Sequence, residues 1–192
     1  MAATAHAQPP ISEIAQRAFD RLRQHDAASA LKGVNDGLAA YPDNPVLLAT
    51  RGYVYIDLGD YQAAVPDMDQ ALARVPSANG YQAACWARAL AGVELDQALA
   101  YCDKSLQLNP GRPWAQYDTR GFLHLRRGEY DQAVSDYGEA LKLQPKQASS
   151  LYGRGLARLK LRQDQAGHVD LAAATKIEPG IVATYAKRGI VP

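Results

Sequence analysis

The stretch Trp114–Gln147, WAQYDTRGFLHLRRGEYDQAVSDYGEALKLQPKQ, determines the fold of this chain. Its small residues Gly121, Ala133 and Ala140 recur at helical intervals, and small residues let two antiparallel helices approach each other closely. Pro145 cannot continue the second helix and so ends it. The stretch therefore predicts a helical hairpin of 34 residues.

Copies of this hairpin occupy most of the chain. A proline closes each copy, and the prolines follow one another at steps of 34 or 35 residues: Pro42, Pro76, Pro110, Pro145 and Pro179. One hairpin alone leaves an apolar face uncovered, and stacking further copies covers it. The sequence therefore predicts five stacked hairpins, over residues 11–44, 45–78, 79–112, 114–147 and 148–181.

The fixed places of the small residues and the closing proline resemble the tetratricopeptide repeat (TPR). The resemblance covers about residues 11–181. It implies an all-α fold, a right-handed superhelical solenoid of antiparallel helix pairs with five repeats, and a truncated C-terminal capping helix within residues 182–192. Helices are expected near residues 11–24, 27–40, 45–58, 61–74, 79–92, 148–161, 164–177 and 182–188.

Composition excludes several classes of protein. The formal net charge is +1, which argues against a nucleic-acid binder held by bulk charge. No apolar run approaches the roughly 18 residues that a membrane span needs. Two cysteines are too few for a disulfide-dense scaffold. We therefore expect neither a nucleic-acid partner nor a membrane span.

The first ten residues, MAATAHAQPP, form a tail that we expect to be mobile. Ala5-His6-Ala7 resembles the small-x-small end of a secretory signal, although a basic start and an apolar middle are missing. Two interpretations stay open. The favoured one is a signal-peptide remnant on a periplasmic or otherwise exported chain, and the alternative is an alanine-rich tail on a cytoplasmic chain.

An arginine and an aspartate recur at fixed places in the hairpins, at the seventh and twenty-third positions. These two places lie on facing helices of one hairpin, so the sequence predicts ion pairs between them. Repetition at a fixed phase is what packing produces, whereas an active site would occur once. We therefore predict structural, not catalytic, roles for Arg51–Asp67, Arg120–Asp136 and Arg154–Asp170.

The third hairpin lacks this pair and carries both cysteines near the same places. A Cys85–Cys102 disulfide would link its two helices, and such a bond also suits the exported interpretation. The alternative is two reduced thiols in the core, where free cysteine is common. Trp86 stands where the TPR family has a small residue, and we expect it in the core rather than at a ligand.

The family resemblance also places a binding groove. In TPR proteins the first helix of each repeat lines a concave surface that holds a peptide or a helix of a partner. The matching positions here are mostly apolar or aromatic, which favours an apolar or amphipathic segment. The alternative for part of this set is packing between neighbouring repeats. The implied partner-binding residues are Phe19, Tyr53, Ala87, Asp118, Phe122, Tyr152 and Leu156.

Searches for catalytic chemistry give little. The four histidines have no partner at metal-ligand spacing, and no phosphate loop or dinucleotide fingerprint occurs. We predict no catalytic residue, no metal and no cofactor. The leading hypothesis is a non-enzymatic scaffold or adaptor that binds another protein or peptide. The second is a self-assembling protein whose groove accepts a terminus of another copy, giving a homo-oligomer.

Overall fold

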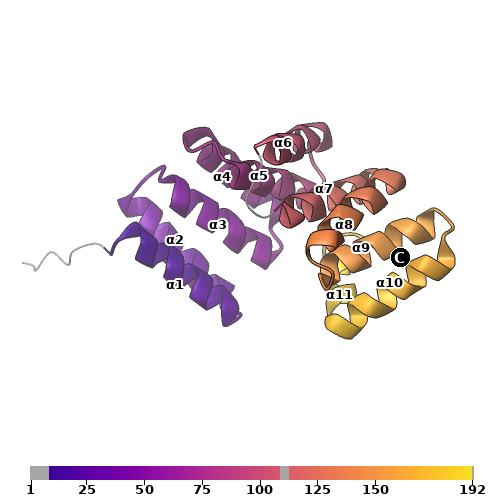
Figure 1. The fold of residues 1–192 in the computed structure, drawn as a ribbon. Coiled ribbons are helices and arrows are strands. Elements are labelled where there is room, and N and C mark those ends of the chain that lie inside the picture. The colour runs from indigo at the N-terminus through magenta and orange to yellow at the C-terminus, as the bar shows by residue number, and fades with distance from the viewer. Residues whose placement is uncertain (1–8, 109–112, 192) are drawn as a thin grey trace, which may run out of the picture. The chain divides into compact units, whose positions relative to one another are not determined.

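A computed structural model of the chain describes residues 9–108 and 113–191. Within these ranges it contains eleven helices and no strand, and the helices pack in consecutive pairs (Figure 1). The predicted all-α class of paired helices is confirmed. The helices are α1 (Ile11–Arg23), α2 (Ala27–Ala40), α3 (Pro45–Leu58), α4 (Tyr61–Arg74), α5 (Ala78–Ala91), α6 (Leu95–Gln107), α7 (Trp114–Arg127), α8 (Tyr130–Leu143), α9 (Ala148–Lys160), α10 (Asp164–Ile177) and α11 (Ile181–Lys187).

The helices form two compact units. Unit 1 is Met1–Pro76 and contains α1 to α4, and unit 2 is Ser77–Pro192 and contains α5 to α11. The division falls within two residues of the predicted end of the second repeat, at residue 78. Unit 1 therefore holds two hairpins, and unit 2 holds three hairpins followed by a shorter helix.

Local sequence signals set the ends of the helices. Before α3, the side chain of Asn44 accepts hydrogen bonds from the backbone N–H groups of the first turn, and Pro45 occupies the first helical position. At the other end, Gly59, Gly92 and Gly128 close α3, α5 and α7 with φ of 82°, 72° and 76°. Glycine adopts this left-handed conformation without a steric penalty, so these turns are fixed by the sequence.

Small residues inside the helices make room for large ones on their neighbours. In unit 2 the fully buried ring of Tyr137 on α8 lies against Gly121 of α7 and Gly153 of α9. A Cβ at Gly121 would come within 3.0 Å of this ring, and one at Gly153 within 2.2 Å. Gly121 and Gly153 are therefore required by close packing of consecutive helices.

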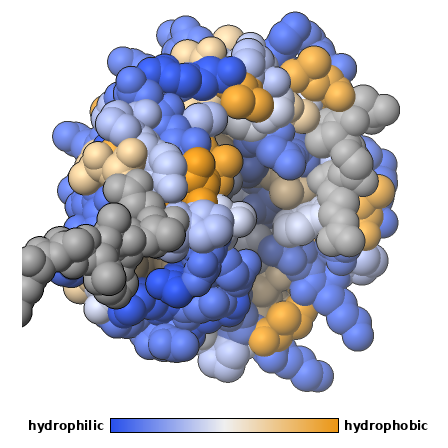
Figure 2. Space-filling view, turned by 90° about the vertical axis from the view of Figure 1, so that its left-hand side faces the viewer, coloured by the Kyte–Doolittle hydropathy of each residue, from blue (hydrophilic) through white to orange (hydrophobic). Residues whose placement is uncertain are grey.

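The face of the molecule shown in Figure 2 offers mainly local apolar patches. Among the described residues in view in Figure 2, hydrophobic side chains form small separate patches within a mostly hydrophilic surface. In the described part of the chain, no helix has both the length and the apolar character needed to cross a membrane. On the face shown, no broad apolar belt marks a docking site.

Candidate functional site

The three arginine–aspartate pairs lie where the sequence places them. In each pair the arginine Nε and Nη2 atoms donate to the two oxygens of one carboxylate, over 2.7 to 2.8 Å. The aspartates are buried, and a two-point contact of this kind is strong and directional. The pairs join α3 to α4, α7 to α8 and α9 to α10. They are Arg51–Asp67, Arg120–Asp136 and Arg154–Asp170.

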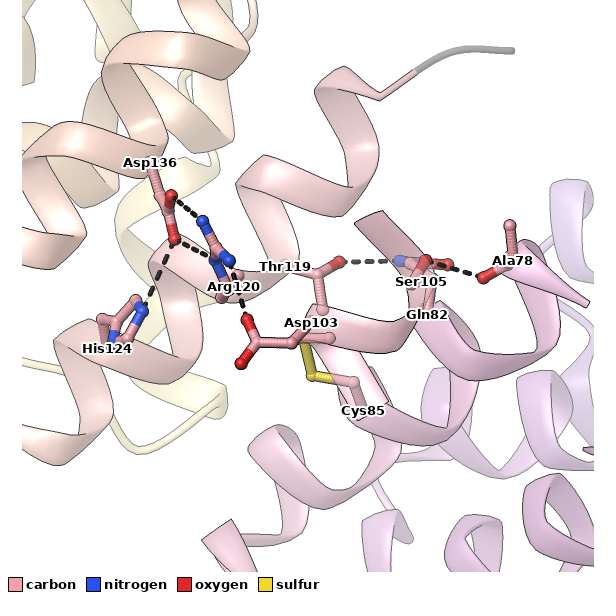
Figure 3. Close-up of a disulfide and its surroundings, with 10 residues drawn as sticks. Ala78, Gln82, Cys85, Asp103, Ser105, Thr119, Arg120, His124 and Asp136 are labelled. Atoms are coloured by element: carbon pink, nitrogen blue, oxygen red, sulfur yellow. Dashed lines mark hydrogen bonds and ion pairs between the residues drawn. A yellow bond between two sulfur atoms is a disulfide. The ribbon is translucent and has the colours of Figure 1, made fainter. Parts of the chain in front are cut away.

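Two of these arginines also reach the preceding hairpin, which the sequence analysis missed. Arg120 donates through Nη1 to Asp103 on α6 over 2.7 Å (Figure 3), and Arg51 donates in the same way to Asn35 on α2 over 3.1 Å. Both acceptors, Asn35 and Asp103, stand at the twenty-fifth place of their repeat. This shared place is the sequence signal that could have predicted the contacts. The fourth repeat has Gly138 there, and its lack of a side chain leaves Arg154 without the same link.

The third hairpin is held by a covalent bond. Cys85 on α5 and Cys102 on α6 form a disulfide, with their Cα atoms 5.5 Å apart (Figure 3). Both cysteines are buried. The side chain of Ser105 adds a hydrogen bond over 2.7 Å to the carbonyl oxygen of Ala78. The disulfide thus joins the two helices at the place where the neighbouring hairpin has its ion pair.

In unit 1, two of the predicted groove residues form an aromatic pair. Phe19 on α1 and Tyr53 on α3 have their ring centroids 6.1 Å apart, with an angle of 54° between the rings. Both residues are half-buried. Burial raises the pKa of the Tyr53 hydroxyl above its ordinary value. Part of each side chain remains at the surface, as a partner contact requires.

In unit 2, four predicted groove residues are buried instead of lining an open surface: Ala87, Phe122, Tyr152 and Leu156. Phe122 is 1% exposed and Tyr152 is 2% exposed. The ring of Tyr185, on α11, lies 5.9 Å from that of Phe122 and 4.7 Å from that of Tyr152. In this arrangement α11 takes up the contacts that the prediction gave to a partner.

Further contacts hold α11 in this place, beside α9 and α10 (Figure 1). The Tyr185 hydroxyl donates to the carbonyl oxygen of Ser149 over 2.8 Å, and it lies 3.5 Å from the hydroxyl of Tyr137. At the end of the helix, Arg126 on α7 donates to the carbonyl oxygen of Arg188 over 2.7 Å. The truncated capping helix is therefore present, and it lies against the inner helices of unit 2.

The side chain of Arg188 lies in an aromatic and acidic environment. Its guanidinium carbon is 5.0 Å from the ring centroid of Trp86 and 5.7 Å from that of Tyr185. Trp86 is half-buried and packs against residues of this chain, with the Phe122 ring in edge contact and the Arg188 cation over one face of the indole.

Asp118 is the acidic member of this environment. Its carboxylate accepts hydrogen bonds from the hydroxyls of Ser150 and Ser149. Burial raises the pKa of the Asp118 carboxyl above its ordinary value, while the two serines and the positive charge of Arg188 act in the opposite direction. A pocket of ≈ 200 Å³ opens beside it, lined by Gln82, Trp86, Trp114, Ala115, Asp118, Thr119 and Gln147.

Among the described residues no group of three or more His, Cys, Asp or Glu side chains is placed to hold a metal ion. His124 is buried on α7, where its Nδ1 lies 2.6 Å from Glu129 and its Nε2 lies 3.6 Å from Asp136. Its position within the ion-pair cluster of the fourth hairpin indicates a packing role.

Comparisons with known proteins agree with this architecture. A family model described as "Tetratricopeptide repeat" matches residues 50–113, and one described as "TPR repeat" matches residues 121–161. No curated protein sequence matches the chain.

Among solved structures, PilW, described as a widely conserved type IV pilus biogenesis factor, is similar with a TM-score of 0.78 and 20% identity. The match covers 89% of this chain and 79% of PilW. A thermophilic TPR protein of Thermus thermophilus is similar with a TM-score of 0.76 and 19% identity, and the match covers 94% of this chain and 97% of that protein. YrrB, described as a TPR protein with an unusual peptide-binding site, is similar with a TM-score of 0.60 and 18% identity, and the match covers 91% of this chain and 90% of YrrB. At these identities the likeness concerns the fold.

Proposed function

Since this chain belongs to the tetratricopeptide repeat family, whose fold generally serves as a non-enzymatic protein-interaction scaffold, we propose a specific mode of binding for it. The inner helices of its hairpins bind an apolar or amphipathic segment of another protein. Helices with an apolar stripe recognise such segments by side-chain packing, so the site needs neither a metal nor a cofactor.

The observation that carries this proposal is the helix seated in unit 2. Tyr185 of α11 packs between Phe122 of α7 and Tyr152 of α9, and its hydroxyl is hydrogen-bonded to the backbone of Ser149. This surface thus has the shape and the hydrogen-bond acceptor needed to hold a short amphipathic helix. In unit 1 the half-buried pair Phe19–Tyr53 offers aromatic contacts of the same kind on α1 and α3.

We also propose that the chain works in an oxidising compartment, such as the bacterial periplasm. Disulfides persist in exported proteins and are rare in the cytosol, so the Cys85–Cys102 bond supports export over the cytoplasmic alternative. The similarity to PilW supports a bacterial setting through its fold alone.

Self-assembly is the second candidate function. The segment held on the inner surface of unit 2 is part of this chain itself, so the same segment from another copy has the right chemistry for that surface. Such exchange would give a homo-oligomer whose size depends on concentration.

The proposal is tested by photo-cross-linking in the full chain. A photoreactive phenylalanine analogue in place of Tyr53 should form a cross-link to a second protein in envelope extracts, and the same analogue in place of the exposed Lys32 on outer helix α2 should not. The captured protein is then purified and its affinity measured directly. We expect Phe19→Ala to weaken that affinity by about tenfold, the loss of one aromatic contact.

A matched control is Tyr61→Ala, which removes an aromatic side chain from α4 and not from an inner helix. Both variants should keep the helical circular dichroism of the unmodified chain. Equal affinity in the Phe19→Ala and Tyr61→Ala variants would contradict the assignment of the binding surface to α1 and α3.

A further inference from the structure

The C-terminal segment, residues 181–191, departs from the rule that governs the rest of the array. In stacked repeats each hairpin touches only its neighbours along the chain. Here Tyr185 contacts Phe122, two hairpins back, and Arg188 lies over Trp86, three hairpins back. The segment therefore crosses the inner helices α9, α7 and α5 of unit 2, in the manner of a bound ligand rather than of a further repeat.

Few side chains of the segment are buried. Helix α11 has seven residues, too short to be stable on its own in water. Only Ile181 and Tyr185 are buried, while Val182, Ala183 and Lys187 are exposed. A short helix with so few buried side chains has low local stability, so the segment can leave the surface while α5 to α10 stay folded.

The contacts of Arg188 indicate which chemical group the inner surface of unit 2 recognises near Trp86 on α5. A guanidinium is held over the face of Trp86, and its positive charge is attracted by the half-buried carboxylate of Asp118. A ligand without a positive charge here would leave that carboxylate with only the hydrogen bonds from Ser149 and Ser150 and no opposite charge, which is less favourable. Arginine fits better than lysine, because its flat guanidinium stacks on an indole and is less strongly hydrated.

We propose that the inner surface of unit 2 is a docking site for a partner helix that carries an aromatic residue and, three positions later, an arginine. Such a helix repeats the arrangement of Tyr185 and Arg188 and replaces the C-terminal segment, which acts as a built-in competitor. This inference rests on the proposed function and names the chemistry of its partner. The pocket beside Trp86 and Asp118 leaves room for the arginine of a partner that enters at a slightly different angle.

The short connection before α11 favours a separate partner over a second copy. Helix α10 ends at Ile177 and α11 begins at Ile181, so three residues join them. Three residues span at most about 11 Å when fully extended. The segment can reach the surface of another copy only if the two chains lie in immediate contact at this point, whereas a separate helix has no such restriction.

The experiment uses the full chain and a fluorescent peptide of residues 179–192, PGIVATYAKRGIVP, read by fluorescence anisotropy. In the variant Tyr185→Ala with Arg188→Ala, the built-in segment loses its two recognition side chains. We expect the peptide to bind this variant at least about tenfold more tightly than the unmodified chain, because the competitor that lowers the apparent affinity is weakened. Adding Asp118→Asn should then reduce peptide affinity by about fivefold, through the lost charge attraction.

Two controls keep the result interpretable. A peptide with both the tyrosine and the arginine changed to alanine should bind neither chain. Should the double variant fold poorly, hydrogen exchange of residues 181–188 in the unmodified chain gives the same information: a saturating concentration of the original peptide should accelerate it.

Equal peptide binding by the unmodified chain and the double variant would overturn the proposal, as would no binding to either chain with unchanged hydrogen exchange. A dimeric unmodified chain in which Tyr185 cross-links to Phe122 of another copy would also overturn it, in favour of a second copy as occupant. The Tyr53 cross-link lies in unit 1 and is measured independently, so the proposed function can hold while this inference fails.

Discussion

Units 1 and 2 carry aromatic side chains on their inner helices, yet these side chains differ in accessibility. In unit 1 the rings of Phe19 and Tyr53 are half-buried. In unit 2 Phe122 and Tyr152 are closed off by Tyr185. The repeat pattern thus determines where a binding surface is built, and a segment outside the pattern determines whether that surface is free.

The difference in accessibility between the two units can be tested first by removing the ring of Tyr185, which covers the aromatic side chains of unit 2. Tyr185→Ala deletes a side chain that is 1% exposed and contacts two aromatic rings. We expect it to lower the free energy of unfolding of unit 2 by about 3–5 kcal/mol, the range for truncating a buried aromatic side chain. Tyr53→Ala in unit 1 should cost about 1 kcal/mol, because half-burial contributes about half of the transfer free energy.

Denaturant unfolding followed by two signals separates these effects. Both tryptophans, Trp86 and Trp114, lie in unit 2, so fluorescence reports on that unit, whereas far-ultraviolet circular dichroism reports on both. Tyr185→Ala should shift the fluorescence transition, and Tyr53→Ala should leave it in place. A fluorescence shift of similar size in both variants would remove the distinction between a covered and an accessible surface.

The contrast between the units also indicates what the sequence could and could not predict. Helix positions followed from the 34-residue period and its glycines and prolines, because these residues act locally; the expected helix over residues 61–74 is α4 itself, Tyr61–Arg74. The partners Arg51 and Asp67 were placed correctly on facing helices by the same period. Both successes depend on signals repeated along the chain.

The path of α11 could not be predicted in this way. The sequence pattern predicts only a truncated capping helix within residues 182–192, next to the fifth repeat. The actual contacts of Tyr185 with Phe122 and Tyr152 depend on three-dimensional packing of one short segment, and a single occurrence has no periodicity to reveal it. The contact of Arg188 with Trp86 could not be predicted for the same reason, since Arg188 comes from that segment.

The second test concerns the bond that sets unit 2 apart from unit 1. The described part of unit 1 has an ion pair in its second hairpin, whereas the third hairpin has the Cys85–Cys102 disulfide with a sequence separation of 17. Replacing both cysteines by alanine should lower the stability of unit 2 by about 3 kcal/mol, since a loop of this length is no longer closed in the unfolded chain. The fluorescence transition measures this loss.

Intact mass after alkylation under denaturing conditions is the matching control. Two alkyl groups should be added only when a reductant is present. Labelling of both thiols without reductant would contradict the disulfide and with it the argument for an oxidising compartment.

The smallest expected effects come from two glycine-to-alanine changes of opposite sign. In unit 1, Gly33 lies within α2 with no atom within 4 Å of an added Cβ, so Gly33→Ala should raise stability by about 0.5–1 kcal/mol through lower entropy of the unfolded chain.

In unit 2, the Cβ of Gly153→Ala would meet the Tyr137 ring, whose hydroxyl lies beside that of Tyr185. The ring must then shift, which disturbs its contact with Tyr185, and we expect a loss of about 1–3 kcal/mol together with faster hydrogen exchange in residues 181–188. If Gly153→Ala lowers stability and leaves that exchange unchanged, the clash is relieved by movement of other side chains in unit 2. The Tyr137–Tyr185 contact then does not couple α8 to the C-terminal segment.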